Sequence, residues 1–103
     1  MVHARFTFAT LKPEASVDEA RKVWRDGITP AGKDQKGFVG NLLLLNEETR
    51  EGMAISLWES ESAADAGEKS GYYQEQVLKF APLIDVEKIE TKRYNILETT
   101  IKF

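Results

Sequence analysis

The sequence contains no cysteine and only one histidine, His3, among its 103 residues. Without cysteine the chain can form no disulfide, no thiolate metal site and no cysteine nucleophile. A lone histidine cannot build a histidine-rich metal site, and it cannot complete a serine-hydrolase triad without help. Most cofactor-free hydrolytic chemistries are therefore disfavoured, and we expect no bound metal.

Long apolar runs and an excess of positive charge are also lacking. The longest apolar runs, residues 42–45 and 53–57 with Ser56 inside the second, are far shorter than the roughly 20 residues that cross a bilayer. The first residues lack the apolar core of a secretory signal. Lys and Arg number 14 against 17 Asp and Glu and are scattered along the chain, so no basic surface for nucleic acid is expected. These absences predict a cytoplasmic protein that binds neither membranes nor nucleic acid.

What is present fits one soluble domain spanning residues 1–103. Hydrophobic residues make up 42% of the chain and charged residues 30%, which are ordinary values for a folded globular protein. A chain of this length has no room for a second hydrophobic core. We therefore expect a single folding unit.

The first half of the chain predicts a strand followed by a helix. Residues 3–11 alternate, with Phe6 and Phe8 on one face and charged or polar residues on the other. Ser16 and Glu19 form a capping box at the start of a helix. Four apolar residues then recur at helical spacing: Val17, Ala20, Trp24 and Ile28. Gly27 and Pro30 should kink or end this helix, with a polar connection over residues 31–36.

The second half predicts a hairpin, a broken helix and a last strand. Residues 37–45 and 53–58 read as two strands joined by a polar turn. A helix capped by Ser60 or Ser62 should break near Gly71, resume, and end at Pro82. Residues 85–99 are rich in Val, Ile, Thr and Tyr and predict the final strand, with a short apolar piece over 101–103.

This order predicts an α+β fold of ferredoxin-like βαββαβ type with an antiparallel sheet. Leu42 and Leu44 should point to one face of their strand, and Leu43 and Leu45 to the other. Two helices cover only one face of such a sheet, and an apolar face left bare is an association site. We therefore expect a homodimer in which two sheets meet.

Three segments carry a family resemblance: Gly37-Phe38-Val39-Gly40, Leu57-Trp58-Glu59-Ser60-Glu61-Ser62-Ala63-Ala64 and Ser70-Gly71-Tyr72-Tyr73. In these segments and in element order the chain resembles the antibiotic biosynthesis monooxygenase (ABM) domain of the dimeric α/β-barrel superfamily. Members of that family include cofactor-independent oxygenases of quinol-like polyphenols and haem-degrading enzymes. The resemblance implies a ligand cleft between helices and sheet, and it implies no cofactor.

The sequence departs from both groups at their site positions. Polyketide-oxidising members carry an asparagine four residues before the matching tryptophan and a tyrosine six residues after it, where this chain has Ala54 and Ala64. A gapless match from Trp58 to the haem-degrading members puts Gly67 and Val77 at two of their site positions. Haem degradation is accordingly disfavoured.

Trp58 and Tyr72 are the candidate catalytic residues. Small neighbours on its strand face could leave a recess beside the Trp58 indole, although a core or dimer-interface role is the commoner one for a tryptophan at a strand end. Tyr72 falls off the apolar stripe of its helix at the predicted break. Its phenol could bind a ligand hydroxyl or simply lie half exposed.

Asn41, Tyr73 and Arg93 are the candidate substrate-binding residues. Asn41 is a polar residue among leucines, and a buried amide needs partners from either the backbone or a ligand. Tyr73 lies on the apolar helix stripe. Arg93 would pair with an anionic ligand if it points into the barrel, or with carboxylates across the sheet. His3 is the one side chain whose ordinary pKa lies near neutrality, which makes it the natural candidate for a general base. We expect it, however, to be exposed at a frayed strand start.

Two functions remain open at this point. The first is a cofactor-independent monooxygenase that oxidises a small quinol-like or polyphenolic aromatic molecule. The second is a non-catalytic small-molecule-binding or stress-related protein on the same dimeric barrel.

Overall fold

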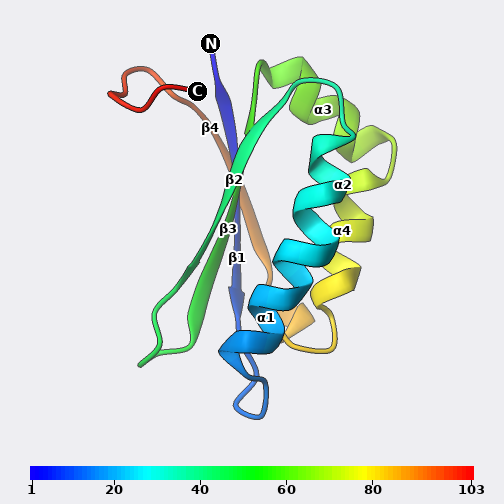
Figure 1. Ribbon diagram of the computed structural model, residues 1–103, viewed down its shortest axis with the longest axis vertical. Helices are drawn as coiled ribbons and strands as arrows, with labels where there is room; N and C mark the ends of the chain where they lie inside the picture. Colours follow the sequence, from blue (N-terminus) through cyan, green and yellow to red (C-terminus); the bar gives the residue numbers. More distant parts are fainter.

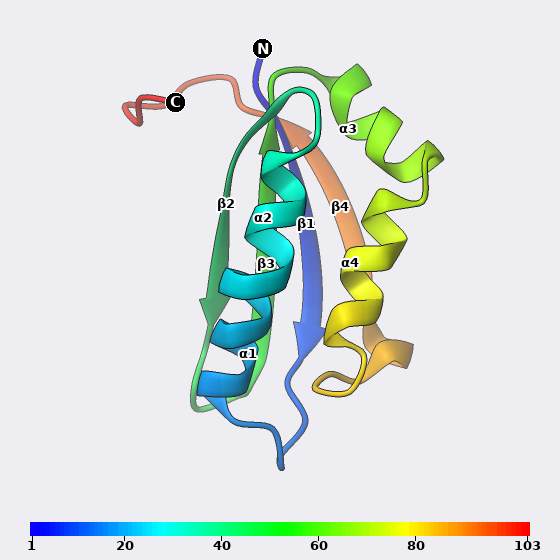
Figure 2. The same ribbon diagram turned by 45° about the vertical axis from the view of Figure 1, so that its right-hand side comes forward.

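A four-stranded antiparallel sheet with the strand order β2-β3-β1-β4 forms one layer of the fold. The computed structural model describes residues 1–103. Its strands are β1 (His3–Thr10), β2 (Phe38–Leu45), β3 (Glu51–Trp58) and β4 (Glu90–Asn95). All helices lie on one face of the sheet, as Figures 1 and 2 show from two sides. The predicted ferredoxin-like α+β fold is confirmed.

The first helical segment differs from its prediction. It consists of α1 (Val17–Val23), the π-helical turn η1 (Trp24–Ile28) and α2 (Thr29–Lys33), which follow one another without a break. The Ser16–Glu19 capping box is present. Gly27 and Pro30 do not end the helix, and the connection predicted from residue 31 begins only after Lys33. Thr29 N–H bonds to Trp24 O, so a widened turn takes up the register change just before Pro30, which has no N–H to donate.

The second helical segment breaks where the sequence predicted. Ser60 caps α3 (Glu61–Lys69), and its side chain accepts a hydrogen bond from Ala63 N–H. Gly71 then adopts a φ of 86°, a left-handed conformation that glycine takes at little cost. The chain resumes helically in α4 (Tyr72–Phe80).

The last strand is shorter than the predicted residues 85–99. A 3₁₀ turn, η2 (Val86–Lys88), precedes it, and β4 covers Glu90–Asn95. Because β4 pairs only with β1, it ends where β1 begins, at the pair His3 and Asn95. The chain beyond Asn95 then leaves the sheet on the side away from the helices (Figure 1).

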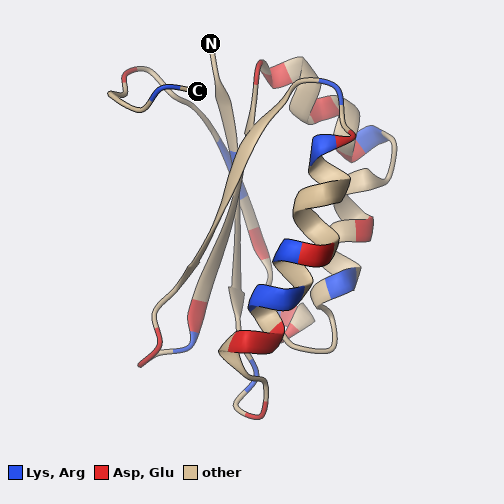
Figure 3. Cartoon of the chain, in the orientation of Figure 1, with Lys and Arg blue, Asp and Glu red and all other residues tan.

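The face of the sheet opposite the helices is uncovered. Leu42 and Leu44 point to this face and are 44% and 43% exposed. Figure 3 shows charged residues of both signs on the helices and loops, whereas β2 has none and β4 carries three, Glu90, Lys92 and Arg93. None of the helices could span a membrane. The bare face is therefore apolar over β2, β3 and β1, as the alternating leucines predicted, and carries Glu90 and Lys92 at its β4 edge.

Buried residues concentrate at the two ends of the helix–sheet interface. One end holds an apolar cluster: Leu11, Ala15, Ala20, Leu83 and Ile84. The other end holds Trp58 and Arg5, the two largest fully buried side chains. Between these ends the layers do not close completely, and this gap is the candidate site.

Candidate functional site

A cavity of about 140 Å³ lies between the sheet and the helices. Strands β1, β2 and β3 form its floor, and η1 and α4 form its other wall. Of its 21 lining residues 16 are hydrophobic, among them Trp24, Leu43 and Phe80. A mostly apolar cavity with a few polar groups is the usual form of a small-molecule site.

The polar side chains of the cavity come from two strands and one helix: Arg5, Thr7, Ser56, Tyr72, Tyr73 and Gln76. Arg5 is the only charged residue in the lining. No carboxylate and no imidazole lines the cavity, and no group of His, Cys, Asp or Glu side chains is placed to hold a metal ion. A ligand in this cavity would therefore meet one fixed positive charge, several hydroxyl groups and one amide.

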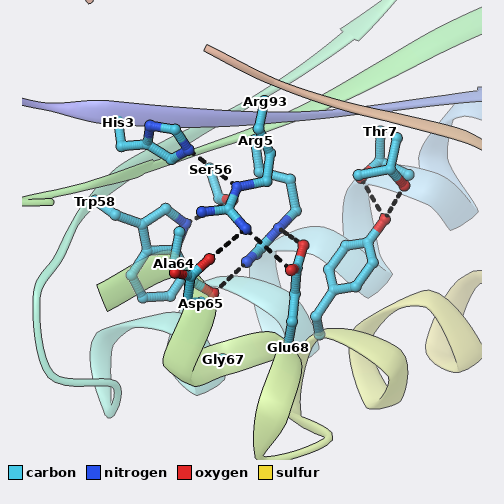
Figure 4. Close-up of polar contacts among 12 residues, drawn as sticks. His3, Arg5, Thr7, Ser56, Trp58, Ala64, Asp65, Gly67, Glu68 and Arg93 are labelled. Carbon is cyan, nitrogen blue, oxygen red and sulfur yellow. Dashed lines mark hydrogen bonds and ion pairs between the residues drawn. The ribbon is translucent and has the colours of Figure 1, made fainter. Parts of the chain in front are cut away.

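Arg5 is almost completely buried, with 2% of its surface exposed. Its Nε donates to Glu68 Oε1 at 3.2 Å, and its Nη2 donates to Ala64 O at 2.7 Å (Figure 4). Burial lowers the pKa of the Arg5 guanidinium, and the neighbouring charge of Glu68 opposes that shift. Both hydrogen bonds lead to α3, so this helix fixes the orientation of the guanidinium.

Two aromatic rings flank the Arg5 guanidinium. Its Cζ lies 4.5 Å from the centre of the Tyr73 ring and 5.6 Å from that of Trp58. Cations at these distances are attracted to the faces of aromatic rings. Strand β1, strand β3 and helix α4 thus all converge on this one side chain.

Arg93 forms a second layer behind Arg5. It is the partner of Arg5 across β1 and β4. Its Nη1 contacts Asp65 Oδ1 at 2.6 Å and Glu68 Oε2 at 3.0 Å. The hydrogen bond from Arg93 lowers the pKa of Asp65. Glu68 is shared by the two arginines, so two cations and two carboxylates balance each other at this end of the fold.

His3 belongs to the same network and is not exposed. The expectation of a frayed, solvent-facing histidine is wrong, because only 4% of its surface is exposed. Its Nε2 accepts a hydrogen bond from Arg93 Nε at 2.9 Å, and its Nδ1 lies 2.7 Å from Asn95 Oδ1. These partners fit a neutral imidazole with its proton on Nδ1. Cross-strand pairing with β4 holds the residue in place, which periodicity in β1 alone does not reveal.

Tyr72 and Tyr73 both line the cavity, but their hydroxyl groups differ. The Tyr73 hydroxyl lies 2.9 Å from Thr7 Oγ1 and 2.6 Å from Thr91 Oγ1, so it already has two partners. The Tyr72 hydroxyl makes no hydrogen bond to the protein. Burial raises the pKa of Tyr72, against the opposing charge of Arg5. At neutral pH Tyr72 is therefore a free phenol donor in the cavity wall.

Trp58 is fully buried and does not line the cavity. Its indole Nε1 donates to Ser56 Oγ at 2.9 Å, and its ring meets Tyr72 edge-on at 6.0 Å between centres. It thus packs directly behind Tyr72 and Arg5. The sequence predicted a recess beside the Trp58 indole. In the structure the cavity lies further along the same face of β3, where Ser56 and Ala54 line it.

Asn41 and Arg93 also lie outside the cavity lining. Asn41 Nδ2 donates to Thr29 Oγ1 at 3.1 Å, which ties β2 to α2. Of the five candidate site residues, the structure therefore brings Tyr72 and Tyr73 to the cavity. Trp58 and Arg93 lie behind the lining residues, and Asn41 lies at the contact between β2 and α2.

Sequence reasoning missed Arg5 and Glu68. Arg5 was placed on the polar face of the first strand, but nothing in that alternation indicates that helices cover this face. The available signal was a lone arginine in an otherwise uncharged strand that must pack against something. Glu68 has no sequence signal at all, because it is 63 residues away from Arg5.

No protein-family profile matches this sequence, and no curated protein matches it significantly. Solved structures do match. A variant of SnoaB, a cofactor-independent oxygenase from Streptomyces nogalater, is similar with a TM-score of 0.75 and 16% identity, over 98% of each chain. A protein from Bordetella bronchiseptica, named as a proposed antibiotic biosynthesis monooxygenase, has a TM-score of 0.73 and 14% identity, over 94% of this chain and 98% of that one. A Nitrosomonas europaea protein named in the same way has a TM-score of 0.69 and 14% identity, over 93% and 90% of the two chains.

The chain has the fold of ABM proteins. The resemblance seen in the three sequence segments is confirmed at the level of the fold, since these structures cover nearly the whole chain. At identities this low the similarity extends to the fold alone, and the chemistry has to be argued from the cavity.

Proposed function

We propose that this protein is a cofactor-independent monooxygenase that acts on a small quinol-like or polyphenolic aromatic molecule. The observation that carries the proposal is the apolar cavity, whose lining includes both Arg5, its single charged residue, and Tyr72, whose hydroxyl has no partner in the protein. The fold shared with SnoaB, described as a cofactor-independent oxygenase, supports it.

The reaction would begin with an ionised phenol in the cavity. Because no carboxylate or imidazole lines the cavity, the phenolic proton would leave to solvent, and Arg5 would stabilise the phenolate that remains. The electron-rich phenolate then passes electrons to dioxygen. In the balanced reaction a ring CH₂ or its enol tautomer plus O₂ becomes a carbonyl plus one water, with one oxygen atom entering each product.

Each candidate residue has a part in this proposal. Tyr72 donates its phenolic hydrogen bond to the substrate, and Tyr73 forms the wall beside it. Trp58 and Arg93 act from behind, the first against Tyr72 and Arg5 and the second through Glu68. Asn41 would reach a substrate only if its link to Thr29 opened.

A homodimer is part of the proposal. Leu42 and Leu44 are 44% and 43% exposed on the bare sheet face. Full burial of an exposed leucine is worth roughly 1.5–3 kcal/mol, so each of these side chains would contribute part of that amount. Two sheets meeting through this face would cover it in both subunits. We place the dimer in the cytoplasm, in keeping with the absence of cysteine.

The alternative is a non-catalytic binding or stress-related protein with the same barrel. Ala54 lines the cavity at the position where the polyketide-oxidising members carry an asparagine, which favours this alternative. It would bind the same aromatic molecules without consuming oxygen.

Oxygen uptake separates the two functions. Reduced naphthoquinols, which have two rings, should be consumed with the uptake of one dioxygen per molecule, at a rate that rises with pH until the bound phenol is fully ionised. Trp24 lines the cavity and reports binding by fluorescence. Saturable quenching without enzyme-dependent oxygen uptake would support the binding protein instead.

A further inference from the structure

We propose that the cavity selects compact aromatic oxyanions, with Arg5 as the residue that recognises the charged oxygen. The class includes one-ring or two-ring phenolates and aryl carboxylates. This inference rests on the proposed function in that it concerns the same cavity, but it predicts binding whether or not turnover occurs.

The Arg5 guanidinium has donor capacity left over. Its Nε and Nη2 are engaged by Glu68 and Ala64, while its Nη1 has no hydrogen-bond partner in the protein. Arg50 Nε is the one fully enclosed side-chain nitrogen or oxygen without a partner, so Arg5 Nη1 stays accessible from the space around it. A fully buried arginine that lines a cavity with one nitrogen free is therefore suited to an oxygen supplied by a ligand.

The charge on Arg5 is the first that a ligand meets. Glu68, Asp65 and Arg93 face Arg5 from α3 and β4, yet none of them lines the cavity. These three groups carry a net charge of −1, which balances the charge of Arg5 from outside the cavity lining. The other polar groups of the cavity lining are hydroxyls and the Gln76 amide, so an oxyanion would encounter attraction from Arg5 without a facing carboxylate.

Arg5 is held rigidly, which favours recognition of one oxygen position. Two hydrogen bonds to α3 and the rings of Tyr73 and Trp58 fix the guanidinium plane. The Tyr72 hydroxyl supplies a second free donor from α4. A preorganised pair of donors binds an anion without the cost of ordering flexible side chains.

The size of the cavity limits the ligand to a compact ring system. Its volume of about 140 Å³ is close to the roughly 150 Å³ of an engineered apolar cavity that holds benzene. One ring fits within the walls, and a second would extend through the open side. Larger polycyclic molecules would have to displace wall residues such as Trp24.

The test uses 4-nitrophenol and its neutral analogue 4-nitroanisole. Near neutral pH, 4-nitrophenol exists as both phenol and phenolate, and the phenolate is visible by its absorbance. The protein should bind the phenolate roughly 10- to 100-fold more tightly than the ether, the range expected of a hydrogen bond to a charged group. The bound phenol should also ionise at lower pH than the free one. Equal affinities with an unchanged titration would overturn the proposal.

Substitutions locate the effect at Arg5. Arg5→Met should abolish the preference for phenolate while keeping affinity for 4-nitroanisole, whereas Arg21→Met on the exposed surface of α1 should change neither. If Arg5→Met fails to fold, the double substitution Arg5→Met/Glu68→Gln removes both charges of the pair. Should the wild type show no phenolate preference, the proposal fails whatever the variants do. A second arm with 4-nitrobenzoate against 4-nitrobenzamide tells a carboxylate ligand from a phenolate.

The two proposals fail separately. If the protein selects oxyanions but consumes no oxygen with any quinol, Arg5 is a recognition residue and the proposed monooxygenase activity is wrong. Oxygen uptake with equal binding of 4-nitrophenolate and 4-nitroanisole keeps the enzyme and overturns the role of Arg5.

Discussion

Arg5 on β1 and Glu68 on α3 form an ion pair with 3.2 Å between Nε and Oε1. It joins the central strand to the helix layer at the polar end of the cavity. The arginine is 2% exposed and the carboxylate 32%, so the pair lies at the border of the interior. Its geometry determines which side of the guanidinium remains available to a ligand.

Glu68→Gln should destabilise the protein because it removes the carboxylate that compensates a buried cation. We expect a loss of about 1–3 kcal/mol in the free energy of unfolding, since Glu68 is partly solvated. Urea denaturation measures the change. Asp18→Asn, which affects an exposed i,i+3 pair with Arg21, serves as the control and should change stability by less than about 0.5 kcal/mol.

Gly71→Ala should destabilise the protein through its backbone alone. Gly71 has a φ of 86°, and an added Cβ would meet nothing within 4 Å. A left-handed conformation costs a non-glycine residue roughly 1–2 kcal/mol. Gly40→Ala is the matched control, because its Cβ also meets open space but its φ is ordinary. Equal thermal unfolding of both variants would contradict this prediction.

Tyr72 should titrate at higher pH than a tyrosine in the unfolded chain. Its pKa is raised by burial, so above about pH 10 the folded state holds a proton that the unfolded state has lost. Stability contributed by Tyr72 is therefore present below that pH and is lost as pH rises toward the folded pKa. Ultraviolet titration should show one late tyrosine that Tyr72→Phe removes. If all three tyrosines titrate together in the wild type, the residue is solvated.

Asp65 should contribute to stability on the acid side. The hydrogen bond from Arg93 lowers its pKa, so its stabilising effect is present above the unfolded pKa and is lost as pH falls through the folded value. Asp65→Asn should flatten the dependence of stability on pH below about pH 5 and leave the slope at alkaline pH unchanged. Unfolding curves at a series of pH values test this, and an unchanged acid slope would count against the Arg93 contact.

Leu42→Glu should convert a dimer to monomers in sedimentation experiments, because it places a charge on the bare sheet face. Leu78→Glu is the control, since Leu78 is also exposed but lies on α4, on the opposite side of the molecule. A wild-type chain that sediments as a monomer at micromolar concentration would exclude the proposed pairing.

Several features followed from local sequence. The capping box of Ser16 and Glu19, the break at Gly71 and the hairpin of β2 and β3 depend on neighbouring residues, and the structure has all three. The first helix continues past its predicted end because a π turn before Pro30 shifts the backbone hydrogen bonds by one residue. Residue periodicity does not reveal such a shift. The shortened β4 reflects the length of its partner β1, which composition does not encode.

The sequence by itself determined the elements, their order and the apolar character of the bare sheet face, because these arise from periodicity and from turn and cap residues a few positions apart. Tertiary structure alone decided the site. Arg5, Glu68 and Tyr72 come from three elements, and only the packing of α3 and α4 on the sheet makes Arg5 a buried cation with a free nitrogen at a cavity. Burial and long-range pairing produce that chemistry, and neither is a property of any one segment.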